Sequence, residues 1–307
     1  MIATSTASKY ILAVDLGTSG AKVALIGVDG RVAAWESEPI ALRVLPGGGA
    51  EQAPDDWWRA LVAATRRLLA RHNGPASDIA AVCCSTQGEG AVPVDRDGRA
   101  LMGCTLWMDM RAAPHLLLVR DAFPEVYERT YKFLNVLDYL NLRLTGRFVA
   151  TFDSILTSWI ADNRDADDVK YDPSLVRGCA IDADKLPEIV KCTEVLGPLT
   201  TAAAEALGPA PGTQVAAGVE IRQVRDQIQA NARAAALIAA AGLGEIGFAD
   251  VPELVELEHV FEPQTGDRAV YDERYQTFLE IHKRMRPLYR RVNRDSPLQP
   301  GGVRGAT

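Results

Sequence analysis

Short apolar segments open the chain and predict a β-meander. Residues 10–15 and 21–26 are almost continuously apolar, which is typical of strands buried on both faces. A third apolar segment, 31–35, follows a turn at 28–30 that ends in glycine. The first forty residues are therefore predicted to form three neighbouring strands.

Helices and strands alternate after this meander. Pro54 and the two acidic residues behind it predict the start of a helix, whose apolar stripe contains Trp58, Leu61, Val62, Leu68 and Leu69. Further strands are predicted at 79–83, 91–94, 100–102 and 214–217, and further helices at 125–145 (stopped by Gly146), 153–161 and 200–207. This order predicts an α/β fold with a mixed sheet.

The pattern becomes sparse after residue 218. It predicts a short strand at 220–224, an alanine-rich helix at 228–241, a strand at 254–261 and a long helix at 271–293. These elements are few for an independent second domain. The segment 294–307 is rich in proline and glycine and is predicted to be disordered.

Composition narrows the class of protein. The 307 residues carry 33 basic and 40 acidic side chains, a net charge of −7, which argues against broad nucleic-acid binding. No apolar run approaches the roughly 20 residues that span a bilayer, and the first eight residues do not resemble a signal peptide, so we expect a cytoplasmic protein without membrane contact.

The five cysteines do not have the spacing of a metal site. None lies in a Cys-x-x-Cys motif, and we expect reduced, partly buried thiols. Cys83 and Cys84 are neighbours in a predicted strand, so their side chains should point to opposite faces of the sheet.

Residues 15–22, which join the first two predicted strands, are the most informative segment. Two glycines permit close approach of a phosphate, and the hydroxyls of Thr18 and Ser19 can donate to its oxygens. Asp15, at the end of a buried strand, can hold a hydrated Mg²⁺. The alternative is a glycine-rich hairpin turn beside a solvated aspartate.

This segment resembles the first phosphate-binding hairpin of the actin-like ATPase superfamily and of the FGGY carbohydrate kinases within it, which include xylulokinases and glycerol kinases. Four other segments resemble elements of the same family in the same order. They are the substrate loop at 85–90, the Trp-x-Asp-x-Arg element at 107–111, the helix at 138–146 and a helix near the end of such kinases at 228–245. The phosphate-binding residues implied by the resemblance are Gly17, Thr18, Ser19, Gly20 and Lys22, with Asp15 as the metal ligand.

The resemblance also implies an architecture. Residues 1–218 correspond to an actin-like, ribonuclease H-like first domain with a mixed sheet, slightly shortened near 111–124. Residues 219–293 correspond to an incomplete second α/β domain. The implied activity is transfer of the ATP γ-phosphate to a hydroxyl of a ketose or polyol, with a xylulose-like sugar favoured, ATP and Mg²⁺ as cofactors and a homodimer as a possible assembly.

Polar residues near two loops fit a sugar site. Several hydrogen bonds are needed to hold the hydroxyls of a polyol or ketose, and Gln87, Glu89, Asp109 and Arg111 can supply them, while Trp107 offers an apolar face. Two alternatives remain open. Asp109 and Arg111 can simply pair with each other, and Trp107 can be an ordinary core residue.

The chain departs from the family at its catalytic centre. In such kinases a Gly–Asp step follows the strand that resembles 214–218, and that aspartate is the general base. Here Gly218 is followed by Val219 and Glu220, and the second phosphate-binding turn and the adenosine loop are not found. Glu220 is a poor substitute, because the surroundings that would fix its geometry are absent. We therefore expect no catalytic residue.

Two functions remain after these departures. The chain is an internally deleted FGGY kinase, or a non-catalytic remnant that still binds sugar or phosphate. An actin-like ATPase or assembly protein is a third possibility, which Gln87, Glu89 and Trp107 disfavour. In either case the helices at 228–241 and 271–293 lack their normal cover, and we expect them to dock on the first domain or to expose apolar patches.

Overall fold

The computed structural model describes residues 10–72, 76–111, 115–162, 164–165, 168–220 and 230–251. They all belong to one compact unit, Met1–Val255, of the two into which the chain divides. The elements predicted at 254–261 and 271–293, and most of the strand predicted at 220–224, lie outside the described residues, as does the tail 294–307.

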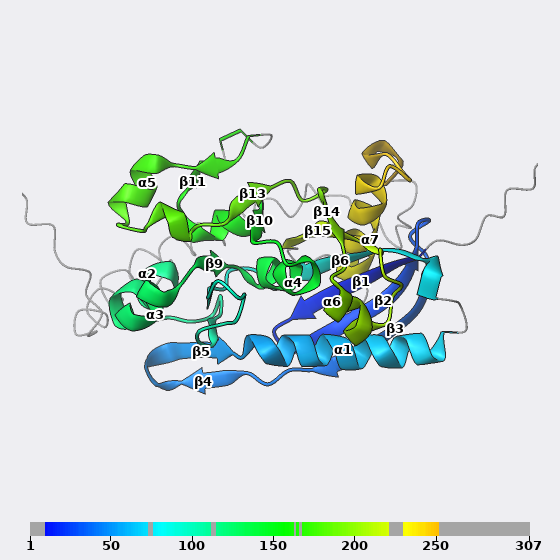
Figure 1. The fold of residues 1–307 in the computed structure, drawn as a ribbon, viewed down its shortest axis with the longest axis horizontal. Helices are drawn as coiled ribbons and strands as arrows, with labels where there is room; N and C mark the ends of the chain where they lie inside the picture. Colours follow the sequence, from blue (N-terminus) through cyan, green and yellow to red (C-terminus); the bar gives the residue numbers. More distant parts are fainter. Residues whose placement is uncertain are drawn as a thin grey trace, which may run out of the picture. The chain divides into compact units, whose positions relative to one another are not determined.

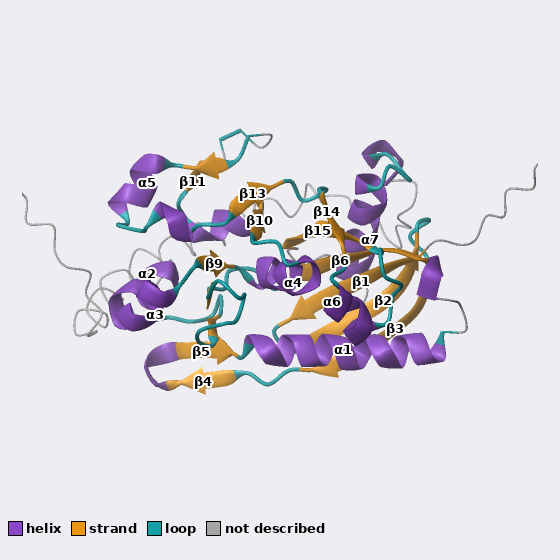
Figure 2. Ribbon diagram, viewed as in Figure 1, coloured by secondary structure: helices purple, strands orange, loops and turns teal. Residues whose placement is uncertain are grey.

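A six-stranded mixed sheet forms the centre of this unit (Figures 1 and 2). Its order is β14 (Val195–Pro198), β15 (Gln214–Glu220), β6 (Ile79–Thr86), β1 (Tyr10–Gly17), β2 (Gly20–Gly27) and β3 (Val32–Pro39). β1, β6 and β15 are parallel, whereas β2, β3 and β14 are antiparallel to their neighbours. The predicted meander and mixed sheet are thus confirmed.

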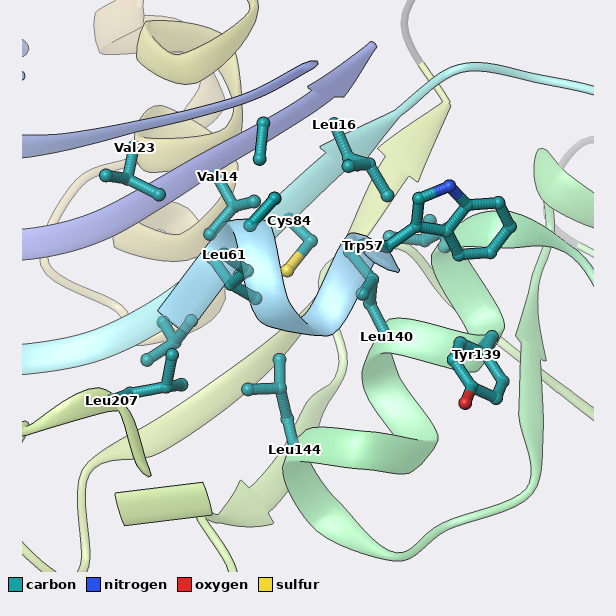
Figure 3. Close-up of a cluster of buried hydrophobic side chains, with 14 of the residues drawn as sticks. Val14, Leu16, Val23, Trp57, Leu61, Cys84, Tyr139, Leu140, Leu144 and Leu207 are labelled. Atoms are coloured by element: carbon teal, nitrogen blue, oxygen red, sulfur yellow. The ribbon is translucent and has the colours of Figure 1, made fainter. Parts of the chain in front are cut away.

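Three helices cover one face of the sheet. They are α1 (Pro54–Arg71), α4 (Val136–Thr145) and α6 (Thr201–Leu207), and their apolar side chains meet those of β1, β2 and β6 in the main core. Figure 3 shows Trp57 and Leu61 of α1 next to Leu140 and Leu144 of α4. Leu140 and Leu144 are fully buried because this layer excludes water from the sheet.

The apolar stripe of α1 agrees only in part with the prediction, because Leu61 and Leu68 are buried whereas Trp58, Val62 and Leu69 are only partly buried. Trp57 is fully buried, whereas Trp58 is only partly buried and packs under the guanidinium of Arg143, 4.6 Å from its ring. The sequence does not distinguish these adjacent tryptophans. The choice follows from tertiary contacts, because the indole N–H of Trp57 donates to the buried side chain of Gln52.

The alanine-rich helix α7 (Ala230–Gly242) covers the opposite face. Its buried alanines pack on Ile11 and Ala13 of β1 and on Ala81 and Cys83 of β6. Cys84 belongs to the main core on the other side, which confirms the predicted orientation of the two thiols. All five cysteines are free. Of the two outcomes predicted for the 228–241 helix, docking on the first domain is the one observed.

The segment 122–162 is less regular than predicted. In place of one helix at 125–145, the structure has α3 (Pro124–Arg129), β9 (Lys132–Leu134) and α4. The helix is interrupted because β9 pairs with β7 (Val92–Val94), a long-range contact that local pattern does not reveal. The helix predicted at 153–161 is only a short 3₁₀ turn, Ser154–Ser158.

Of the two strands predicted at 91–94 and 100–102, only the first forms, as β7. The turn at 95–98 forms, but β7 makes only an isolated bridge, Val94 to Ala100, with the returning segment. The remaining elements are short and complete the described part of the chain. They are β4 (Arg43–Leu45), β5 (Gly49–Gln52), β8 (Cys104–Thr105), α2 (His115–Ala122), β10 (Val149–Thr151), β11 (Ala161–Asp162), β12 (Lys170–Tyr171), α5 (Pro173–Gly178), β13 (Glu188–Val190) and the 3₁₀ turns Pro46–Gly48, Ala76–Asp78, Ala183–Lys185 and Phe248–Asp250.

A buried carboxyl group holds the start of α4 against the following loop. Asp138 accepts hydrogen bonds from the backbone N–H of Asn135 at 3.0 Å and from the hydroxyl of Ser154 at 2.9 Å. Burial raises the pKa of Asp138 to about 7, although these hydrogen bonds act in the opposite direction.

Gly218 lies where β15 bulges against β6. Its φ is +81°, and a Cβ atom there would lie 2.0 Å from the carbonyl oxygen of Cys84. Since that oxygen belongs to the backbone of the neighbouring strand, the overlap cannot be relieved by turning a side chain. Only glycine fits this position.

We predict that Gly218→Ala unfolds the domain or lowers its free energy of unfolding severely. The matched control is Gly212→Ala, where φ is +92° but nothing lies within 4 Å of the added Cβ. It should lose only about 1–2 kcal/mol, the cost of a left-handed alanine. Urea denaturation of both variants measures the difference, and equal losses would contradict the close contact.

We predict that Ala239→Leu destabilises the domain by about 1–3 kcal/mol, because Ala239 is fully buried between α7 and the sheet. Ala234→Leu, at a half-buried position of the same helix, should cost less. Thermal denaturation compares them. If Ala239→Leu is no less stable than Ala234→Leu, α7 does not dock as described.

Candidate functional site

The turn between β1 and β2 is tight. Gly17 and Gly20 face each other in the antiparallel ladder, and Thr18 and Ser19 connect them. A Cβ atom on Gly20 would lie 2.5 Å from the carbonyl oxygen of Glu38 in β3, so the close approach of β3 requires glycine there. Ser19 is exposed at the tip.

Asp15 and Lys22 are cross-strand neighbours at the base of this turn. The Lys22 ammonium lies 2.9 Å from a carboxylate oxygen of Asp15, whose side chain is only 4% exposed, while that of Lys22 is 32% exposed. Asp15 is therefore not the solvated aspartate of the alternative interpretation. It follows Ala13 by two residues, which places it on the face of the sheet that α7 covers.

The environment of Asp15 limits how a metal would be held. Within the part of the chain that the structure describes, no three His, Cys, Asp or Glu side chains are arranged to bind a metal ion. Mg²⁺ is commonly held by one or two carboxylates, with phosphates and water completing its coordination. Asp15 fits a site of that kind and does not fit an all-protein cage.

Thr18 belongs to a closed ring of hydrogen bonds. Its hydroxyl donates to the Gln87 carbonyl oxygen at 2.7 Å, the Gln87 amide donates to Gln52 at 2.9 Å, and the Gln52 amide donates to the backbone carbonyl of Thr18 at 2.8 Å. The Trp107 indole N–H donates to the same Thr18 hydroxyl at 3.2 Å. In this structure the Thr18 hydroxyl proton thus goes to Gln87, and Ser19 supplies the exposed hydroxyl of the turn.

Gln52 is not identified as a site residue by the sequence. This residue ends β5, a strand of four residues that are all buried, and its side chain is 0% exposed. Its only signal in the sequence is a polar residue just before the helix that begins at Pro54. Neither alternation nor a motif marks it as a residue that contacts both the 17–20 turn and the loop after β6.

Gln87 and Glu89 follow the carboxyl end of β6. The backbone N–H of Gln87 donates to the carbonyl of Leu16 at 2.7 Å and continues the parallel pairing beyond the strand. Glu89 has φ +59°, an uncommon conformation for a residue with a side chain. The residue is half-buried, and its carboxylate makes no hydrogen bond or ion pair with the described residues.

Trp107 is 53% exposed and is therefore not an ordinary core residue. Because its indole N–H is bound to Thr18, the ring is held next to the turn. Gln87 is also bound to the Thr18 hydroxyl. The structure thus brings the predicted residues Thr18, Gln87 and Trp107 into one cluster.

Asp109, Arg111 and Glu51 form a buried ion-pair network beside this cluster, called the lock below. The Arg111 guanidinium lies 2.6 Å from Asp109 and 2.7 Å from Glu51, which is the neighbour of Gln52. Asp109 also accepts from the backbone N–H of Ala50 at 3.0 Å. The alternative interpretation, that Asp109 and Arg111 pair with each other, describes what is observed. Their role in sugar contact stays a prediction.

The protonation of this lock follows from its contacts. Burial acts to raise the pKa of Asp109, but hydrogen bonds from Arg111 and from the Ala50 backbone outweigh it, so the pKa lies below its usual value. The hydrogen bond to Asp109 raises the pKa of Arg111. Both groups are therefore charged at neutral pH and hold the 107–111 loop to β5.

Comparison with known proteins identifies the family. The profile of the N-terminal domain of the FGGY family of carbohydrate kinases matches residues 10–120 and 112–224. This chain belongs to that family. The predicted resemblance and its fold are thereby confirmed.

Among curated proteins, xylulose kinase of Escherichia coli K12 is 30% identical over 236 residues, which cover 67% of this chain and 47% of that protein. Xylulose kinase of Bacillus subtilis 168 is 28% identical, covering 68% and 47%. The chain spans about half the length of these relatives.

Solved structures show the same fold. A ligand-bound xylulose kinase from Lactobacillus acidophilus superimposes with a TM-score of 0.64 at 23% identity, covering 69% of this chain and 48% of that one. A xylulose kinase from Rhodospirillum rubrum superimposes with a TM-score of 0.63 at 22% identity, covering 68% of this chain and 48% of that one.

Among the described residues, no helix is both long and apolar enough to cross a bilayer.

We predict that Arg111→Met costs about 3–5 kcal/mol of stability, because it leaves the buried Asp109 and Glu51 carboxylates without their cation. Arg164 offers a matched control, since it pairs with Asp162 at the same sequence spacing but is 84% exposed. Arg164→Met should hardly change stability. Chemical denaturation measures both, and equal effects would contradict a structural role for the lock.

Proposed function

We propose that this FGGY-family chain binds a ketose or polyol, with a xylulose-like sugar favoured, against Trp107, Gln87 and Glu89. The half-exposed indole offers an apolar face for the carbon skeleton, and the amide and carboxylate offer partners for hydroxyl groups. The names of the relatives from E. coli and B. subtilis, both xylulose kinases, support this choice of sugar.

The observation that carries the proposal is the conformation of Glu89. A non-glycine residue with φ near +60° is strained, and such residues concentrate at binding and catalytic sites. Its carboxylate, half-buried without a protein partner among the described residues, is available to accept hydrogen bonds from sugar hydroxyls. The next residue, Gly90, packs closely on Cys104 and Val136. A Cβ atom at this position would lie 2.8 Å from a side-chain atom of each, so glycine allows the loop to lie there.

The phosphates of a nucleotide belong at the turn of residues 17–20. Ser19 and the backbone N–H groups of the turn are the donors there, and the partly exposed ammonium of Lys22 supplies positive charge. In carbohydrate kinases ATP is the phosphate donor, and Mg²⁺ neutralises charge on its phosphates. Here Asp15 would hold such an ion through its carboxylate.

We do not expect this chain to transfer the phosphoryl group by itself. The expected base follows Gly218, but β15 continues through Val219 and Glu220, whose backbones pair with Ser85 and Thr86. The sequence has neither an aspartate directly after Gly218 nor a second phosphate-binding turn, so transfer would lack most of its electrostatic support. The competing function is an active ATP-dependent sugar kinase.

We predict that D-xylulose raises the thermal midpoint of the wild-type protein. In Glu89→Gln, about ten times more D-xylulose should be needed for the same rise, because a hydrogen bond to a charged group is lost. Glu205→Gln is the control, because Glu205 is exposed on α6. If no pentulose, hexulose or polyol changes the thermal midpoint, the proposed sugar binding is refuted.

An ADP-release assay with Mg-ATP and the same sugars tests the competing function. We expect no sugar-dependent ADP release. Release that depends on sugar and disappears in Asp15→Ala would establish an active kinase and refute binding without transfer.

A further inference from the structure

We propose that Gln52 is a positioning residue that couples the phosphate-binding turn to the sugar-binding loop, so that occupancy of one site tightens the other. The proposal rests on the proposed function for the identity of the two ligands. Its structural basis is the ring of hydrogen bonds that joins Thr18, Gln87 and Gln52.

Gln52 uses both ends of its amide at once. The carbonyl oxygen accepts from Gln87 at 2.9 Å and from the Trp57 indole N–H at 3.0 Å, and the amide nitrogen donates to the Thr18 carbonyl at 2.8 Å. With no exposed surface, the side chain has no water to replace these partners. A buried amide that lost them would carry the full cost of desolvation.

The ring connects segments that are distant in sequence. Thr18 lies in the β1–β2 turn, Gln87 lies 69 residues later in the loop after β6, and Gln52 ends β5 between them. A sugar that orients the Gln87 amide also orients the Thr18 hydroxyl through the ring. A phosphate that orders the turn acts on Gln87 by the same route, since coupling between two binding sites is reciprocal.

The chemistry of this position explains why an amide is needed. Only a side chain with a donor and an acceptor closes the ring. Gln52→Met keeps the length and approximate volume of the side chain but removes both groups. It should therefore disconnect the turn from the loop while leaving the groups that would touch ligand unchanged.

Trp57 provides the matched control. Trp57→Phe removes the third hydrogen bond to Gln52 and some core packing, because Trp57 is fully buried, but leaves all three bonds of the ring. If Gln52 only stabilises the core, Gln52→Met and Trp57→Phe should change the coupling between the two ligands in the same way. If Gln52 positions the turn and the loop, only Gln52→Met should abolish that coupling.

The first measurement is the affinity for D-xylulose with and without saturating Mg-ADP, by calorimetry on the full chain. In the wild type and in Trp57→Phe we expect Mg-ADP to tighten D-xylulose about fivefold or more. In Gln52→Met the ratio should fall close to one. A ratio in Gln52→Met equal to that of Trp57→Phe would overturn the proposal.

The second measurement needs no ligand and separates this proposal from the proposed function. Hydrogen exchange of residues 17–20 and 87–90 should quicken together in Gln52→Met and remain near the wild-type rate in Trp57→Phe. If the wild type binds neither D-xylulose nor Mg-ADP, the proposed function fails. The exchange rates alone then test whether Gln52 joins the turn to the loop. Unchanged exchange in Gln52→Met would refute it.

A further variant covers the case in which Gln52→Met does not fold. Thr18→Val keeps the backbone carbonyl and the branched shape of the side chain but removes the hydroxyl that donates to Gln87. It opens the ring at a different bond and should reproduce the faster exchange at 87–90. Wild-type exchange at 87–90 in this variant would overturn the proposal.

Discussion

The need to cover both faces of the central mixed sheet determines how this chain folds. β1 and β6 are buried along almost their whole length, so each face needs its own apolar layer. On one face α1, α4 and α6 provide it. On the other, alanines of α7 meet alanines of the strands, and small side chains let the helix lie close to the sheet. The strand ends that carry the candidate site depend on both layers.

The sequence predicts those parts of the fold that follow from local chemistry. The continuous apolar character of 10–15 and 21–26 identifies buried strands, Pro54 begins α1, and Gly146, with φ +78°, ends α4. Prediction fails where a distant partner decides. The pairing of β9 with β7 interrupts the helix predicted at 125–145, and no periodicity near residue 132 reveals that pairing.

The candidate site shows the same limit at the scale of side chains. The family resemblance leads to Thr18, Gln87 and Trp107, which do lie together, but it does not tell that the Thr18 hydroxyl is bonded to Gln87. The sequence does not identify Gln52 and Glu51, because Thr18, Gln87 and Arg111, which they contact, lie 34 to 60 residues away and every residue of their strand is buried. Hydrogen bonding in a buried polar cluster is a tertiary property.

The end of β15 brings stability and function into one place. Gly218 is required by its contact with the backbone of Cys84, whatever follows it in the chain. In a carbohydrate kinase the next step carries the catalytic base, whereas here the chain continues through Val219 and Glu220, and its next described element, α7, covers the second face of the sheet. Folding therefore needs the glycine and the helix but not the missing aspartate. A chain with this connection keeps a covered sheet, and the hydrogen bonds that join the 17–20 turn to Gln52 and Gln87 do not involve residue 219 or 220.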